Sequence, residues 1–283
     1  MTVHTANART ATGRGVTVRR VGGRLGLILL GLFLCAVLLG PQLAPHRATE
    51  TVGVPYALPG EVGPLGTDHL GRDVLSRLLH GGRPLLLTSL TAAAAGSAAG
   101  VLAGLSAALA TSGRRWLAPV IMRPLDAVAA VPSILVVLLI LTVLPNRAGL
   151  VLSIAVTSVP LSARVVAAAA AQVAGRAHVE AAMARGEGWA WILGRELLPL
   201  IAGPVVADFG MRFVSAVYLV AAAGFLGLST SDSDWGLLVV EALPGAELQP
   251  WALIAPMACV AVIAVGANLG SDAAARRLKG VLA

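Results

Sequence analysis

The stretch LGLILLGLFLCAVLLGPQLAP, residues 25–45, contains no charged side chain. A helix that crosses a bilayer needs about 20 consecutive, mostly apolar residues, and this stretch is long enough. The whole chain has the same character, because 57% of its 283 residues are hydrophobic and only 12% are charged. Soluble domains carry about 25% charged residues. The sequence therefore predicts an integral membrane protein, and no small-residue cleavage site marks its first span as a signal peptide.

Further apolar runs of spanning length follow the first one. They cover residues 84–111, 116–145, 149–174, 197–228 and 250–270. The charged side chains inside them are few: Arg123 and Asp126 begin the third span, Arg164 interrupts the fourth, and Asp208 and Arg212 lie in the fifth. We therefore expect an all-α integral membrane protein with six transmembrane helices.

Basic residues gather on one side of the predicted spans. They occur in the N-terminal tail, after the second span, after the fourth span and in the C-terminal tail, whereas the connection after the fifth span is acidic. Cytoplasmic loops retain lysine and arginine, so we expect both termini in the cytoplasm. This topology also explains the isoelectric point of 10.9, and we expect no nucleic-acid partner.

The spans and charges divide the chain into successive segments. Residues 1–22 are polar and lack an apolar period, which predicts a disordered cytoplasmic tail. We then expect a first transmembrane helix over 23–45, an external segment over 46–83, a transmembrane core over 84–272 and a cytoplasmic tail over 273–283. The core contains a cytoplasmic loop at about 176–198.

The second half of the external segment, LGTDHLGRDVLSRLLHGGR at 65–83, has a helical pattern. Leu70, Val74 and Leu78 recur every four residues, so we expect an amphipathic helix with Thr67 or Asp68 as its N-cap. A structural role for Asp68 and its charged neighbours, through capping and a surface ion pair, is one interpretation. A functional role of this motif is the other.

The cytoplasmic loop contains EAAMARGEGWAWILGRELLPL at residues 180–200. Its first five residues favour helix, Gly186 and Gly188 interrupt it, and the helix can resume at Trp189 before Pro199 opens the fifth span. Small alanines allow another surface to approach, and Glu180 offers a charged contact. The pattern indicates a short helix, a bend and a second helix, suited to docking a partner.

This segment resembles the EAA loop of permease subunits in bacterial ABC importers. Other motifs are similar, in order, to the second permease of the dipeptide, oligopeptide and nickel importers: the 65–83 stretch, MRPLDAVAAVPS at 122–133, FLGL at 225–228, DWG at 234–236 and ANLGSD at 267–272. The resemblance covers about residues 20–280. It implies a MetI-like type I importer fold in a bacterial inner membrane, with peptides or a metal chelate such as nickel as the solute.

The resemblance also implies partners and site residues. The partners are a homologous second permease, two cytoplasmic ATPases, an external binding protein and membrane lipid, with ATP and magnesium bound by the ATPases. The residues that couple to the ATPases would be Glu180, Ala181, Ala182, Arg185, Gly186, Leu198 and Pro199. The external motif would comprise Gly66, Thr67, Asp68, Gly71, Arg72 and Asp73.

Asp208 and Arg212 lie one helical turn apart inside a span, where isolated charges are costly. We expect either a mutual ion pair at a subunit interface or a contact along the translocation path. These charges also leave open an alternative function, a self-contained ion-coupled secondary transporter.

We do not expect an enzyme, because no nucleophile, base or phosphate-binding loop is visible. Nor do Cys35, Cys259 or the isolated histidines His69, His80 and His178 have metal-ligand spacing.

Overall fold

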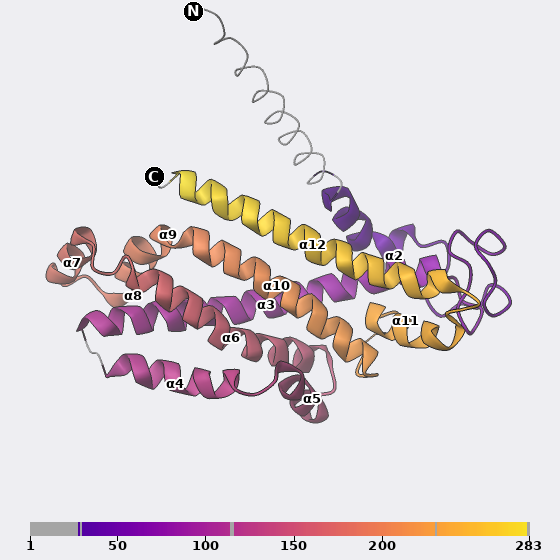
Figure 1. The fold of residues 1–283 in the computed structure, drawn as a ribbon, viewed down its shortest axis with the longest axis horizontal. Coiled ribbons are helices and arrows are strands. Elements are labelled where there is room, and N and C mark those ends of the chain that lie inside the picture. Colours follow the sequence, from indigo (N-terminus) through magenta and orange to yellow (C-terminus); the bar gives the residue numbers. More distant parts are fainter. Residues whose placement is uncertain (1–27, 29, 114–115, 230, 282–283) are drawn as a thin grey trace, which may run out of the picture.

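The fold is a long bundle of helices (Figure 1), given by a computed structural model that describes residues 28, 30–113, 116–229 and 231–281. The predicted tail at 1–22 and the beginning of the first span lie outside the described residues. Residues 30–38 are helical and lead into the short helix α2. The remaining helices are α3 Val74–Gly113, α4 Leu117–Ala129, α5 Ser133–Val143, α6 Arg147–Ala171, α7 Ala177–Ala184, α8 Trp189–Trp191, α9 Leu198–Leu200, α10 Ala202–Phe225, α11 Trp235–Ala242 and α12 Pro250–Val281, with α2 at Gly40–Leu43.

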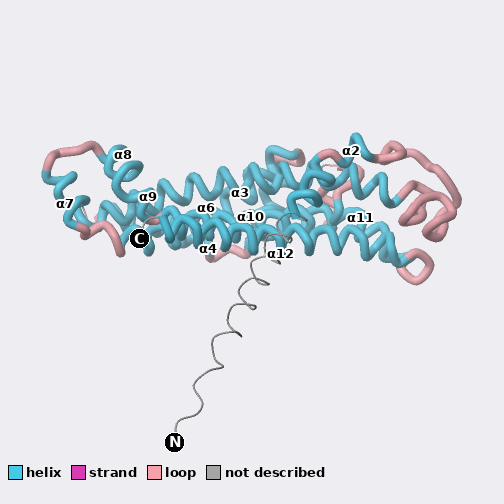
Figure 2. The backbone as a smooth tube through the Cα atoms, turned by 90° about the horizontal axis from the view of Figure 1, so that it is seen from above, coloured by secondary structure: helices cyan, strands magenta, loops and turns pink. Residues whose placement is uncertain are grey.

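The bundle has two distinct ends. Helices α3, α6, α10 and α12 run along its length, while α7, α8 and α9 lie together at one end. The loops of the external segment and α11 lie at the opposite end, as both views show (Figures 1 and 2). Segments far apart in the sequence therefore meet at each end, which is where both predicted functional motifs are found.

Four described helices are long and apolar enough to span a membrane, namely α3, α6, α10 and α12. The bent pair α4 and α5 makes a fifth candidate. The first span is described only in part, so a count of six agrees with these helices and stays a prediction.

The predicted third span is not one straight helix. It is broken between Ala129 and Ser133, where α4 and α5 meet at 87°. Pro132 stands at the break with an extended ψ of 127°. Proline has no backbone N–H, and its ring disfavours helical geometry at the preceding residue, here Val131. The span predicted over 116–145 is therefore made of two helices joined at a sharp bend, and whether the pair crosses the membrane as one span stays a prediction.

Helices α3 and α6 pack closely along a stripe of glycines, Gly96, Gly100 and Gly104. A Cβ atom at Gly100 would overlap Ser162, and one at Gly104 would overlap the carbonyl of Ala163. Small residues at this spacing let two membrane helices approach to backbone distance. The glycine-rich face of α3 thus packs inside the subunit, against α6.

Buried apolar side chains form two main clusters. One lies toward the external end and includes Leu85, Ile154, Val217 and Trp235. The other lies toward the α7 end, where Leu105, Val166, Ile192 and Leu197 pack together. Each cluster joins the long helices to the shorter elements at that end, so α7 and α11 are both held by packing.

The external segment differs from the prediction in where its helix begins. Helix α3 starts at Val74 and continues into the second span, while residues 65–73 form turns. Gly71 has a φ of +73°, which a right-handed helix cannot include. Asp73 caps the helix instead of Thr67 or Asp68, because its Oδ2 accepts from the backbone N–H of Ser76 at 3.0 Å.

Candidate functional site

Helix α7 presents one face to the bundle and the other to the surroundings. Val179 and Ala182 are fully buried against Ile192 and Leu197. Glu180, Ala181 and Arg185 are exposed. The alternation follows from the helical period, since residues three and four apart share a face. The EAA segment therefore offers a small, charged outer surface on a firmly packed base.

The bend after α7 depends on Gly186. Its φ is +76°, and nothing lies within 4 Å of where its Cβ would be. Glycine is favoured here because of the positive φ, and not because a larger side chain would lack room. Gly188 then caps the start of α8 with an ordinary φ of −69°. The predicted order of helix, bend and second helix is present.

The chain returns to the bundle through an unusual element. Residues Ile192–Leu197 form a π-helix, and α9 with Leu198 and Pro199 follows directly. Single π-helical turns inside α-helices occur often at functional sites. Glu196 of this turn lies 3.8 Å from His178 of α7, measured from Oε2 to Nε2. Leu198 and Pro199 thus belong to the return into the bundle and not to the exposed face of α7.

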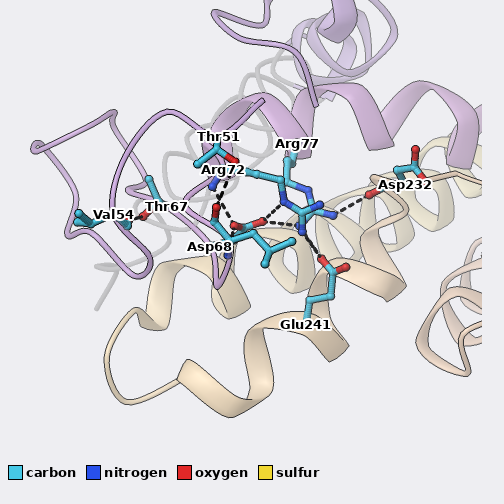
Figure 3. A network of polar contacts seen from close by, with 9 residues as sticks. Thr51, Val54, Thr67, Asp68, Arg72, Arg77, Asp232 and Glu241 are labelled. Atoms are coloured by element: carbon cyan, nitrogen blue, oxygen red, sulfur yellow. Dashed lines mark hydrogen bonds and ion pairs between the residues drawn. The ribbon is translucent and has the colours of Figure 1, made fainter. Parts of the chain in front are cut away.

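The external motif is organised around Asp68 (Figure 3). Its Oδ1 accepts from the backbone N–H groups of Leu70 and Arg72 at 2.8 and 2.9 Å. Its Oδ2 lies 2.7 Å from Nε of Arg72 and 2.6 Å from Nη1 of Arg77. Burial by itself would raise the pKa of Asp68, but these hydrogen bonds and the charge of Arg77 together lower the pKa below its ordinary value of 3.8.

Two residues that were not among the predicted site residues complete this network. Arg77 is 1% exposed, and its Nη1 donates to Oε2 of Glu241 in α11 at 2.5 Å. Its Nη2 donates to the carbonyl of Asp232 at 2.6 Å. Arg72 also reaches Glu241, at 3.2 Å. The predicted surface ion pair is therefore a buried network that fastens the external segment to α11, and we call it the external clamp.

The other motif residues shape the backbone of the clamp. Thr67 is fully buried, donates to the carbonyl of Val54 at 2.6 Å and accepts from the N–H of Ala57 at 2.8 Å. Gly66 has a φ of +70°, and a Cβ there would overlap Gln249. The Gln249 amide donates to the carbonyls of Ala57 and Leu65. The motif thus closes a compact loop against the start of α12.

His69 comes close to the clamp carboxylates. Asp68, His69 and Glu241 each place one ligand atom within 4.8 Å of the others. However, Arg72 and Arg77 already contact both carboxylates in the same place. Two guanidinium groups supply the positive charge that a cation would bring, so this arrangement is explained as an ion-pair network.

Asp234 and Trp235 of the DWG motif join α11 to the bundle. The Nε1 of Trp235 donates to the carbonyl of Leu78 at 2.8 Å. Asp234 caps α11 through the N–H of Gly236 at 2.9 Å and lies against Gly224 of α10. Burial raises the pKa of Asp234 to about 6, although the N–H groups of Gly236 and Leu237 oppose the shift.

Asp208 and Arg212 form a mutual ion pair, as one of the two alternatives predicted, but Asp208 is buried inside the bundle and contacts the same subunit. Oδ1 of Asp208 lies 3.3 Å from Nε of Arg212, and Oδ2 accepts from the hydroxyl of Ser162 in α6 at 2.5 Å. The side chain of Asp208 is 2% exposed and that of Arg212 is 12% exposed. The pair therefore links α10 to α6.

Asp126 of α4 forms a more exposed pair with Arg164 of α6 at 2.8 Å, while Arg123 is exposed.

The long apolar helices of the bundle define a protein that crosses the membrane several times. Residues 100–280 match the family described as binding-protein-dependent transport system inner membrane component. This chain belongs to that family of multi-pass inner-membrane proteins, which confirms the family predicted from the motifs.

Relatives extend the similarity over most of the chain. The di/tripeptide transport system permease protein DppC of Pseudomonas aeruginosa is 32% identical over 257 residues, which cover 87% of this chain and 84% of that protein. The dipeptide permease DppC of Haemophilus influenzae is 27% identical and covers 89% of this chain and 88% of its own length. The glutathione transport system permease GsiD of Pectobacterium atrosepticum is 30% identical, and the match covers 74% of this chain and 69% of that protein.

A solved structure confirms the fold. A chain of the inward-facing MetNI methionine ABC transporter superposes with a TM-score of 0.57 at 16% identity, covering 71% of this chain and 95% of that chain. The predicted MetI-like fold is therefore correct.

Proposed function

We propose that this chain forms half of the translocation path of an ATP-driven importer for peptides. The names of its relatives refer to di- and tripeptides and to glutathione, all of which are short peptides. The observation that carries the proposal is the exposed EAA surface on a packed helix, within a chain of this family. The chain itself contains no phosphate-binding loop, so partner ATPases would bind ATP and magnesium.

The contacts of α7 support its role in coupling. Its buried face packs in the same cluster as Leu105 of α3 and Val166 of α6. An ATPase that docks on Glu180, Ala181 and Arg185 would therefore push on the ends of two long helices, not on a loose loop. Such a push would switch the subunit between inward and outward access.

A second permease would cover an exposed stripe on α10. Met211, Ser215, Tyr218 and Phe225 share one face of this helix, and Tyr218 is 53% exposed. A hydroxyl group in the middle of a span is poorly suited to contact with lipid tails. The exposed face of α10 therefore fits contact with a homologous permease and with the translocation path better than contact with lipid. Asp208 contacts both Arg212 and Ser162, which supports a role in holding α6 to α10.

The orientation would place both termini and α7 in the cytoplasm. The end of α12 lies at the same end of the bundle as α7, opposite the external clamp (Figure 1). Cysteine labelling tests this in a background that lacks Cys35 and Cys259. An impermeant reagent applied from outside should label Glu61→Cys and should not label Glu187→Cys. The reverse pattern would overturn the orientation.

Docking is tested by recovery of the ATPases with the membrane-inserted chain. Glu180→Lys should reduce their recovery, because it reverses the charge on the exposed face of α7 without disturbing its buried face. Glu247→Lys makes the same charge change on an exposed residue at the other end of the bundle and should leave recovery unchanged. Undiminished recovery with Glu180→Lys would exclude the coupling role.

A further inference from the structure

An apolar groove with a volume of about 500 Å³ runs between residues 30–38, α3, α10 and α12. Leu34, Leu86, Phe213 and Ile263 are among the side chains that line it, and Ser271 is the single polar side chain among the described lining residues. On α12 the lining extends from Ile263 to Ala274, which corresponds to about 16 Å of helix at 1.5 Å per residue. The groove is therefore long, narrow and almost purely hydrocarbon in character.

The location of the groove points to a lipid tail. All of its walls belong to membrane-spanning helices or to the predicted first span. An acyl chain matches such walls in shape and chemistry, and filling the space restores packing contacts that a void lacks. Because lipid tails are as apolar as leucine, the groove alone cannot select one lipid over another. Selection would have to come from a polar contact at one end of the groove.

Arg277 supplies that contact. Gly270 and Ala274 line the groove, and Arg277 follows them at the same helical spacing, one turn beyond Ala274. Helical side chains lean toward the N-terminus of their helix, which brings Arg277 back over the end of the groove. Arg277 is exposed and forms no ion pair within the part of the chain that the structure describes. Arg276 is also exposed but lies about 100° around the helix, away from the groove.

We propose that this groove binds one acyl chain of an anionic phospholipid from the surrounding bilayer, with its phosphate held by Arg277. Basic residues at the ends of membrane helices attract anionic head groups. The bound lipid would fill the space between the first helix and the core, and so fasten residues 30–38 to α10 and α12.

Native mass spectrometry of the purified full-length chain in detergent tests the proposal. The chain is titrated with phosphatidylglycerol or phosphatidylcholine that carry identical acyl chains. We expect tighter retention of phosphatidylglycerol, and about fivefold weaker retention in Arg277→Gln, the effect of one basic residue near a lipid surface. Arg276→Gln is the matched control and should retain the lipid as the parent does.

A second pair of variants tests the groove itself. A Cβ at Gly270 has nothing within 4 Å, so Gly270→Trp can fill the groove without a clash at its base. It should lose both lipids, whereas Leu269→Trp, on the exposed neighbouring face, should keep them. A thermal unfolding transition measured for each of the four variants is the control for folding.

Two results would overturn the proposal. Equal losses in Arg276→Gln and Arg277→Gln would indicate general attraction of lipid to the basic end of α12. Full retention in Gly270→Trp would indicate that lipid binds elsewhere and that the chain's own N-terminal residues fill the groove.

Discussion

Nη1 of Arg77 lies 2.5 Å from Oε2 of Glu241, although 164 positions separate the two residues in the sequence. Arg77 lies in the first turn of α3, before the predicted second span, whereas Glu241 belongs to the short helix α11. Asp68 shares the same guanidinium group. A single buried cation thus joins three segments at the end of the bundle that holds α11, and its effect on stability can be measured separately from transport.

Removing a carboxylate from the clamp should destabilise the protein according to its burial. Asp68→Asn should cost about 3–5 kcal/mol, because it removes the more buried carboxylate and leaves Arg72 and Arg77 with the partly exposed Glu241 as their shared anion. Glu241→Gln should cost about 1–2 kcal/mol, because its side chain is 24% exposed and Asp68 still pairs with Arg77. Thermal unfolding in detergent measures both, with Glu247→Gln as a control. A larger loss from Glu241→Gln than from Asp68→Asn would contradict the central position of Asp68.

The two buried external aspartates should give opposite responses to pH. Because the pKa of Asp234 is raised from 3.8 to about 6, the folded state holds this proton more tightly than the unfolded state. The contribution of Asp234 to the free energy of unfolding is therefore greatest below pH 3.8 and is lost as the pH rises to about 6. The change is at most about 3 kcal/mol, since each pKa unit corresponds to about 1.4 kcal/mol. Asp234→Asn should remove this slope while keeping the helix cap.

The lowered pKa of Asp68 acts in the opposite sense. Its contribution is fully present above its ordinary pKa of 3.8 and is lost as the pH falls through the lower folded value. Unfolding midpoints measured from pH 3 to pH 7 in the parent and in Asp234→Asn separate the two windows. A slope between pH 4 and 6 that persists in Asp234→Asn would show that another group is responsible.

The bend in the docking segment should depend on one glycine and not on its neighbour. Gly186→Ala should cost about 1–2 kcal/mol locally, because alanine is strained at a φ of +76°. Gly188→Ala is the matched control, since its φ is −69° and open space surrounds it too. Recovery of the partner ATPases should fall in the first variant only. Equal recovery in both would show that the bend does not position α7.

The membrane-embedded pair should show strong coupling in a double-mutant cycle. Asp208→Ala leaves Arg212 without its partner in the interior of the bundle and should cost about 3–5 kcal/mol. The double variant Asp208→Ala, Arg212→Leu should recover part of this loss, because no uncompensated charge remains. Additive losses, measured by unfolding in detergent, would contradict an ion pair.

Transport should require partners. The purified chain alone in proteoliposomes should give no ATP-driven uptake, and adding a second permease, the ATPases and a binding protein should restore it. Uptake driven by an ion gradient with the chain alone would instead support the secondary transporter considered from the sequence.

Long apolar runs were sufficient to predict an all-helical membrane bundle, because spanning a bilayer imposes a length and a composition. The same runs concealed the break at Pro132, since hydropathy is continuous across it and only the backbone chemistry of proline marks it. The spacing of Leu70, Val74 and Leu78 predicted a helix capped by Thr67 or Asp68, but the left-handed conformation of Gly71 delays the helix to Val74. Sequence patterns thus predicted that a helix is present more accurately than they predicted the residues at which it begins or breaks.

The parts of the candidate site that could be predicted are those whose residues lie close together in the sequence. The EAA segment contains its alanines, its glycine bend and its charges within a few residues, and its folded form matches that order. Glu241 has no such signal, because its role depends on contacts with Arg72 and Arg77 that only the folded chain creates. The contact of Ser162 with Asp208 is equally tertiary. Sequence patterns indicate which residues are costly to bury, and the fold determines their partners.

Helix α3 is continuous from Val74, beside the external clamp, to Gly113, beyond the cluster that holds α7. Its 40 residues correspond to a rod about 60 Å long at 1.5 Å per residue. If such a rod tilts by about 5°, its two ends shift relative to each other by about 5 Å. Under the proposed function, a small rotation imposed by ATPases on the α7 end would become a displacement of about 5 Å at the other end of α3, where an external binding protein would release its cargo.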